Sequence, residues 1–143
     1  MESVELNLKG IKTNCIFCKI VEKKLESNIV YENNNIIAFL DIDPINEGHV
    51  LIVPKKHYLD IEELPKNILE EIMELSQKTV RALKKIYNPS GYSIMQNGGK
   101  FNDIGHFHLH IFPRYQNDGF GWKCDESTIN VSKEISDKIS KAI

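Results

Sequence analysis

The sequence has few cysteines, no excess of charge of either sign and no long apolar run, and each lack excludes a class of protein. Its 143 residues contain only three cysteines, too few for the disulfide framework of a small secreted domain. The formal net charge of −2 gives no electrostatic reason to expect nucleic acid or an anionic membrane as a partner. No apolar run could cross a bilayer, and residues 1–12 lack a signal-peptide core. The sequence therefore predicts a single-domain protein of the reducing cytoplasm.

What the sequence does contain is a pattern of β-rich and helical segments that predicts an α+β fold. Helical spacing of apolar residues indicates a short helix over 15–23, a long helix over about 65–87 and a last amphipathic helix with Ile135, Ile139 and Ile143. Segments typical of strands cover residues 28–32, 36–40, 49–54, 92–96 and 106–112. Three strands, a helix and two further strands in this order favour a mainly antiparallel sheet.

The most informative strand segment is 106–112, in which histidine alternates with large apolar residues. Side chains alternate between the two faces of a strand, so His106, His108 and His110 share one face and the residues between them can enter a core. Such a row can bind a metal ion, or it can act on a phosphorus centre as nucleophile and oxyanion partner. The stretch alone does not decide between these, or against a solvated strand face.

A cysteine pair adds a second possible chemistry. Cys15 and Cys18 form a Cys-x-x-Cys motif, which together with two distant histidines makes a Cys2His2 inventory for tetrahedral zinc. The motif alone is also compatible with a redox-active pair or with two reduced thiols. Cys124 has no partner in the sequence and is assigned no role.

Together these motifs resemble the histidine-triad (HIT) superfamily. Residues 106–112 match its His-φ-His-φ-His-φ-φ signature, where φ is an apolar residue, and further blocks in family order occur at 41–44, 48–57, 95–98, 113–114 and 118–120. The resemblance covers about Asn14 to Trp122. It implies a HIT domain over 14–122, a flexible lead-in over 1–13, and a tail over 123–143 whose helix packs on the domain. It also implies a five-stranded sheet and a homodimer in which two sheets join.

The resemblance implies an enzyme that hydrolyses or transfers nucleoside monophosphates. His108 would attack the α-phosphorus and form a nucleotidyl-histidine that water then cleaves, while His110 and His49 lie against the same phosphate. The substrate would be a purine nucleotide, either a nucleoside phosphoramidate or a dinucleoside polyphosphate. The intact His108 weighs against the alternative of a zinc-stabilised nucleotide-binding module with a scaffolding or regulatory role, because a pure binder needs no nucleophile.

Family positions also suggest the contacts to substrate. Asp41 would accept hydrogen bonds from the ribose hydroxyls, although an Asp before Pro44 also suits a turn. The remaining candidates are Gln96 near the phosphate, Asn102 as a neighbouring amide, and Phe17, Ile20 and Leu25 around the base, where they could equally be plain core.

One departure from the family concerns the leaving group. Many relatives carry Gly-Gln-Ser/Thr-Val before the triad, with a hydroxyl able to touch the bridging atom, whereas this chain has Phe-Asn-Asp-Ile-Gly over 101–105. Asp103 brings a negative charge that is unfavourable beside a phosphate, unless it points away from the site.

In relatives with Cys-x-x-Cys, two cysteines and two histidines bind zinc. The matching residues here are Cys15, Cys18, His57 and His106. Because all four positions would be filled by protein, the zinc would be structural and leave no position for substrate.

Overall fold

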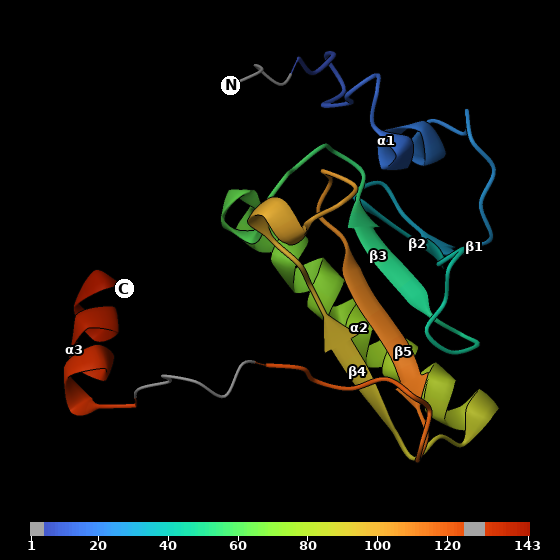
Figure 1. The fold of residues 1–143 in the computed structure, drawn as a ribbon. Coiled ribbons are helices and arrows are strands. Elements are labelled where there is room, and N and C mark those ends of the chain that lie inside the picture. Colours follow the sequence, from blue (N-terminus) through green and yellow to red (C-terminus); the bar gives the residue numbers. More distant parts are fainter. Residues whose placement is uncertain (1–4, 125–130) are drawn as a thin grey trace.

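The computed structural model describes residues 5–124 and 131–143 and has one five-stranded sheet (Figure 1). The strands are β1 (Ile29–Glu32), β2 (Ile36–Leu40), β3 (Val50–Pro54), β4 (Gly91–Met95) and β5 (Leu109–Arg114). They lie in the order β1-β2-β3-β5-β4, and every neighbouring pair is antiparallel. The expected α+β class and antiparallel sheet are confirmed. Among the described residues, no helix combines the length and apolar character needed to span a membrane.

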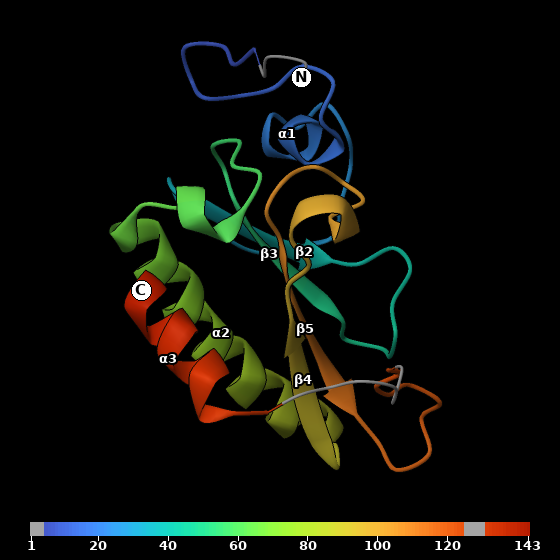
Figure 2. The same cartoon turned by 60° about the vertical axis from the view of Figure 1, so that its left-hand side comes forward.

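Helices cover both faces of the sheet and so divide the core in two. The long helix α2 (Lys66–Tyr87) lies along one face, as Figures 1 and 2 show, and packs its buried stripe on β2, β3 and β5. The short helix α1 (Ile16–Val21) lies over the other face, where Phe17 and Ile20 meet Phe39, Leu51 and Val53. Two short 3-10 turns, Ile61–Glu63 and Gly99–Phe101, complete the domain. The face of α1 is the one that carries the histidines.

The histidine segment follows the predicted alternation, but it is a strand only in its second half. Phe107 is buried beneath α2 together with Leu109 and Ile111, as expected for one face. Pairing with β3 begins at Leu109 rather than at His106. The cause is upstream, since Gly105 has a positive φ of 71° and the Phe107 amide donates to the Tyr58 carbonyl at 2.7 Å. His106 and His108 therefore stand on a loop that enters the sheet.

The described residues before α1, from residue 5 on, make contacts that a flexible lead-in over 1–13 would not, and residues 1–4 lie outside the described part of the chain. Ile11 is buried in the core beneath α1. The His57 amide donates to the Gly10 carbonyl at 2.7 Å, and Asn7 accepts the Lys9 and Ile11 amides through its side chain. The packed domain thus begins before Asn14, because Ile11 supplies apolar surface that the short α1 cannot.

The C-terminal helix forms as expected but exposes its apolar stripe. Helix α3 (Lys133–Ala142) begins at Ser132, whose Oγ accepts the Ile135 amide at 3.3 Å. None of its residues is buried, and Figure 1 shows it apart from the sheet. Its packing on the domain stays a prediction.

Candidate active site and metal cluster

A cavity of about 500 Å³ lies on the α1 face of the sheet. This is within the range of roughly 300–1,000 Å³ that is usual for small-molecule sites. Its polar wall includes Asp41, His49, Asp103, His108 and His110, together with Glu26, Ser27 and Asp43. Its apolar wall includes Phe17, Ile20, Leu25, Phe39, Leu51 and Ile104. Seven residues that the sequence predicted as catalytic or substrate-binding are therefore brought together, and the apolar ones face open space as well as core.

His108 is held in the tautomer that a nucleophile needs. Its Nδ1 lies 2.8 Å from the carbonyl oxygen of His106. A carbonyl only accepts hydrogen bonds, so Nδ1 of the neutral ring carries the proton and Nε2 keeps its lone pair. The ring is 3% exposed and meets Phe17 edge-on, with 5.2 Å between the ring centroids. An oriented, unprotonated nitrogen at the wall of a cavity can attack an electrophile.

His49 and His110 form a hydrogen-bonded pair whose tautomers are also defined. The Ile45 amide donates to His49 Nδ1 at 3.0 Å, so the proton of His49 is on Nε2. His49 Nε2 donates in turn to His110 Nδ1 at 2.9 Å, and His110 therefore carries its proton on Nε2. Burial lowers the pKa of both rings, that of His110 to about 4, so both are neutral near pH 7. His110 is left with one N–H donor for a ligand.

Three aspartates, Asp41, Asp43 and Asp103, line the cavity beside this histidine pair. Asp41 Oδ1 accepts a hydrogen bond from the Asp43 amide at 2.9 Å, as expected for an aspartate that closes a turn. Its Oδ2 lies 3.6 Å from His49 Nε2 and 3.8 Å from His110 Nδ1. Asp103 lines the cavity, and its charge opposes the effect of burial on the pKa of His110. Asp103 therefore faces the site and does not point away from it.

The same geometry makes the group of Asp41, His49 and His110 a poor metal site, although their ligand atoms lie within 4.8 Å of one another. A metal on His49 Nε2 would require the ring proton on Nδ1. That nitrogen already accepts the Ile45 amide, so two N–H groups would then face each other.

Two predicted substrate contacts do not reach the cavity. Asn102 is buried, donating to the Leu59 carbonyl at 3.1 Å and accepting the Gly105 amide at 3.0 Å. The turn before the triad uses both ends of this side chain, and the expected contact of its amide with substrate stays a prediction. Gln96 follows the edge strand β4 and donates to the Asn97 carbonyl at 2.8 Å, away from the cavity wall.

Sequence reasoning missed other wall residues. Ile104 and Ile42 line the cavity from loops, where no periodic pattern marks them. Ser27 also lines it, and its Oγ is the one buried side-chain nitrogen or oxygen of the described residues that has no hydrogen-bond partner. A buried hydroxyl of this kind is available to a polar ligand atom.

A second cluster, of Cys15, Cys18, His57 and His106, lies beside the cavity and is entirely buried. The distances between sulfur and Nδ1 atoms are 3.4 Å for Cys15–His106 and 3.5 Å for both Cys18–His57 and Cys18–His106. The two Nδ1 atoms are 3.2 Å apart. A tetrahedral zinc ion with ordinary bond lengths requires about 3.6 Å for S···N and about 3.3 Å for N···N. These four residues can hold a metal ion.

Neighbouring groups prepare the four ligand atoms. The Lys12 amide donates to Cys18 Sγ and the Cys18 amide to Cys15 Sγ, both at 3.4 Å. His106 donates from Nε2 to the Pro54 carbonyl at 2.8 Å, which leaves the Nδ1 lone pair facing the sulfurs. The hydrogen bond between the two thiols lowers the pKa of Cys15 and raises that of Cys18, so Cys15 is the one favoured as the metal-binding thiolate and Cys18 holds the proton that a metal would displace. Neither cysteine is in a disulfide.

Comparisons with known proteins identify the family of this chain. A family model described as the HIT domain matches residues 22–117. An uncharacterised HIT-like protein of Methanocaldococcus jannaschii is 45% identical over 127 residues, which are 85% of this chain and 98% of that protein. The adenosine 5'-monophosphoramidase of Saccharomyces cerevisiae is 35% identical over 118 residues, which are 79% of this chain and 72% of the yeast protein.

The solved structures that resemble this chain are also of HIT family proteins. The crystal structure of a HIT family protein from Bacillus anthracis has a TM-score of 0.82 at 36% identity, covering 92% of this chain and 98% of that one. A zinc-bound histidine-triad family protein from Mycobacterium smegmatis has a TM-score of 0.70 at 30% identity, with 90% of this chain and 91% of that one covered.

Proposed function

The chain belongs to the HIT domain family, and from this premise we propose that it is a nucleotide hydrolase or transferase that attacks the α-phosphorus of a purine nucleotide. The observation that carries the proposal is the lone pair on His108 Nε2 at the wall of the cavity. The name of the yeast relative, adenosine 5'-monophosphoramidase, supports the reaction class.

The reaction proceeds in two steps with His108 as the nucleophile. Nε2 forms a bond to the α-phosphorus as the bond to the leaving group breaks, and the leaving group departs with that electron pair and takes up a proton from solvent. Water then attacks the phosphorus of the nucleotidyl-histidine, the P–N bond breaks with its electron pair returning to Nε2, and the proton of the water goes to solvent as the nucleoside monophosphate is released. The Nε2–H of His110 donates to a phosphate oxygen on which charge gathers, and His49 holds that donor in place.

The rest of the cavity suits a nucleoside. Phe17, Ile20 and Leu25 offer the apolar surface on which a purine ring packs, and Asp41 Oδ2 accepts from the ribose hydroxyls. The Ser27 hydroxyl adds a polar contact at the wall. These roles follow from position in the cavity and from the chemistry of each side chain.

Asp103 favours a phosphoramidate over a dinucleoside polyphosphate as the substrate. Its carboxylate lies on the same wall as His108 and His110, in the segment that leads into the triad. A polyphosphate leaving group would bring several negative charges to this carboxylate, whereas an amine leaves as a neutral or cationic group. The charge at residue 103 therefore selects for an amine.

The test is a comparison of kcat/KM for adenosine 5'-phosphoramidates and dinucleoside polyphosphates. The wild type should prefer an amine leaving group, most of all one that carries an added positive charge. Asp103→Asn should reduce that preference by about tenfold, which corresponds to one charge contact near a protein surface. Gln116→Ala, an exposed change away from the cavity, is the control. A preference that is equal in the wild type and in Asp103→Asn would contradict the role of Asp103.

We also propose that the cysteine–histidine cluster binds one structural zinc ion. Zinc would cross-link α1, the segment after β3 and the entry to β5. Because protein fills all four positions, substrate has no route to the metal. The cysteines are free thiols, which fits the cytoplasmic location we propose. The alternative of a zinc-stabilised nucleotide-binding module predicts the same metal but no covalent intermediate.

A homodimer joined along β4 is a further proposal. This strand is an edge of the sheet, and its Tyr92 and Ile94 are 46% and 40% exposed. An open edge with apolar side chains favours pairing with another chain. Sedimentation velocity at micromolar concentration should give a dimer, and Ile94→Lys should shift it toward monomer. A wild-type monomer at that concentration would contradict the proposal.

A further inference from the structure

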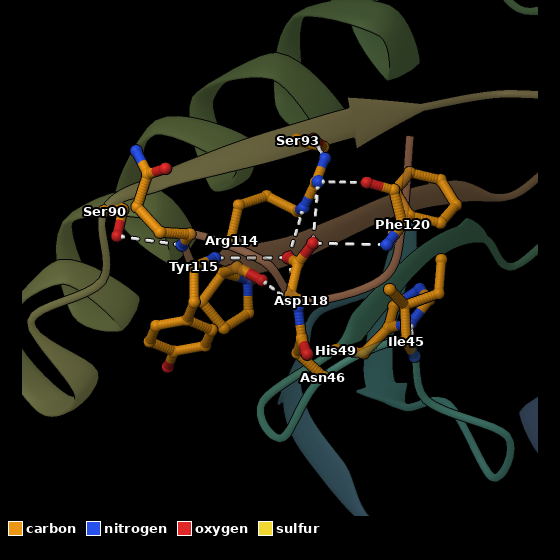
Figure 3. A network of polar contacts seen from close by, with 11 residues as sticks. Ile45, Asn46, His49, Ser90, Ser93, Arg114, Tyr115, Asp118 and Phe120 are labelled. Atoms are coloured by element: carbon orange, nitrogen blue, oxygen red, sulfur yellow. Dashed lines mark hydrogen bonds and ion pairs between the residues drawn. The ribbon is translucent and has the colours of Figure 1, made fainter. Parts of the chain in front are cut away.

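A polar network ties the turn after β5 to the loop over residues 41–48 (Figure 3). At its centre is Asp118, whose side chain is 6% exposed. Arg114 donates to both of its carboxylate oxygens, at 2.6 and 2.9 Å, and the Tyr115 amide donates to it at 3.1 Å. The hydrogen bonds from Arg114 hold the pKa of Asp118 well below its usual range. The carboxylate is therefore a constant acceptor near neutral pH.

Asn46 connects this network to the loop. Its Nδ2 donates to the Pro113 carbonyl at 2.8 Å and to Asp118 Oδ2 at 3.1 Å (Figure 3). One amide thus bonds both to the last residues of β5 and to the turn after it, three and eight residues beyond His110. None of these contacts touches the cavity, and the Asn46 side chain is not among its walls.

The backbone around Asn46 is what contacts the histidines. The neighbouring Ile45 amide donates to His49 Nδ1 at 3.0 Å, and the His49 amide donates to the Asn46 carbonyl at 3.2 Å. Figure 3 shows Ile45 and His49 beside Asn46 at the edge of the network. The His49 ring is further held by Phe112, with 4.7 Å between their centroids. The N–H that meets His49 thus belongs to the residue directly before the anchored Asn46.

We propose that Asn46 is a positioning residue that sets the tautomers of His49 and His110, and so the donor that His110 offers to the phosphate. The inference rests on the proposed function. With the Ile45 amide in place, protons lie on Nε2 of both rings. Without it, His49 is free to carry its proton on Nδ1 and to accept from His110. The Nε2 of His110 then has a lone pair, which repels a phosphate oxygen that the N–H would stabilise.

The structure supplies a matched control for this role. Ser93 accepts a hydrogen bond from Arg114 at 3.1 Å and so belongs to the same network. It lies on β4, away from the loop over 41–48. Ser93→Ala removes one contact of the network and leaves Asn46 anchored, whereas Asn46→Ala releases the loop.

The test combines a tautomer measurement with kinetics. Nitrogen-15 spectra of the imidazoles, recorded without substrate, should give Nε2-protonated His49 and His110 and Nδ1-protonated His108 in the wild type and in Ser93→Ala. Asn46→Ala should give a mixture of tautomers at His49 and His110 while His108 keeps its state. In the same variant kcat should fall about tenfold with KM nearly unchanged, as expected when a wrong tautomer costs transition-state stabilisation alone.

Each outcome has one meaning. Unchanged tautomers in Asn46→Ala, or a changed mixture with full kcat, would overturn the proposal. If that variant does not fold, Asn46→Ser is measured in the same way, because its shorter hydroxyl donor cannot satisfy both acceptors. A wild type that turns over no nucleotide would overturn the proposed function instead, and the spectra would still report on the tautomers.

Discussion

Replacing His108 with alanine should lower the rate of nucleotide hydrolysis by roughly a thousandfold or more, because the covalent route is lost with the nucleophile. The affinity for a nucleoside monophosphate should change little. The contacts proposed for base and ribose come from other residues, such as Phe17 and Asp41. Single-turnover rates with an adenosine phosphoramidate, and calorimetric binding of AMP, measure the two quantities separately.

A matched comparison is His110→Gln, which keeps the nucleophile and changes the donor. This variant should be about a hundredfold slower than the wild type, the usual effect of one lost oxyanion donor, yet still form the intermediate. Rapid quenching without acid should recover a nucleotide on His108 from the wild type and from His110→Gln, and none from His108→Ala. If His108→Ala retained wild-type turnover, His108 would not be the nucleophile and the proposed mechanism would be wrong. A wild type that binds AMP but forms no covalent nucleotide would instead favour the zinc-stabilised binding module.

The alternation of residues in 106–112 was enough to predict that the three histidines share one face and that Phe107, Leu109 and Ile111 enter a core on the other. This prediction needs only local information, because side chains alternate with a period of two in any strand, whatever surrounds it. The start of the strand was predicted three residues too early. That boundary depends on a hydrogen bond between Phe107 and Tyr58, which are distant in sequence, and on the positive φ of Gly105.

The same distinction applies to the site. Asp41, His49, His108 and His110 could be predicted to lie together because motifs fix their spacing, and they line one cavity. Asn102 could not, because an amide can bind a ligand or close a turn, and the choice depends on the Leu59 carbonyl, which is 43 positions away in the chain. The network around Asn46 was missed for a similar reason, since nothing local in the sequence pairs Asn46 with Asp118.

Zinc removal should have a large effect on stability. Protein purified without chelator should carry one zinc per chain, and stripping it should lower the melting temperature by roughly 10 °C or more. Cys15, Cys18, His57 and His106 come from three separate segments, so a shared metal constrains the unfolded chain strongly. Without metal the buried sulfurs and imidazoles lose partners that the apolar surroundings do not replace.

Cys18→Ser should lose the metal and the same part of the stability, whereas Cys124→Ser, an exposed cysteine outside the cluster, should keep both. Elemental analysis measures the zinc content of each variant, and circular dichroism measures its melting temperature. Activity should decline only as the fold loosens, because His106, while binding zinc through its ring, uses its backbone carbonyl to orient His108. As chelator is added, the turnover rate and the near-ultraviolet circular dichroism signal should therefore decrease together. Zinc-free wild-type protein, or a Cys18→Ser variant of full stability, would contradict the zinc proposal and leave His106 a hydrogen-bonding role, with Pro54 and the neighbouring thiols as partners.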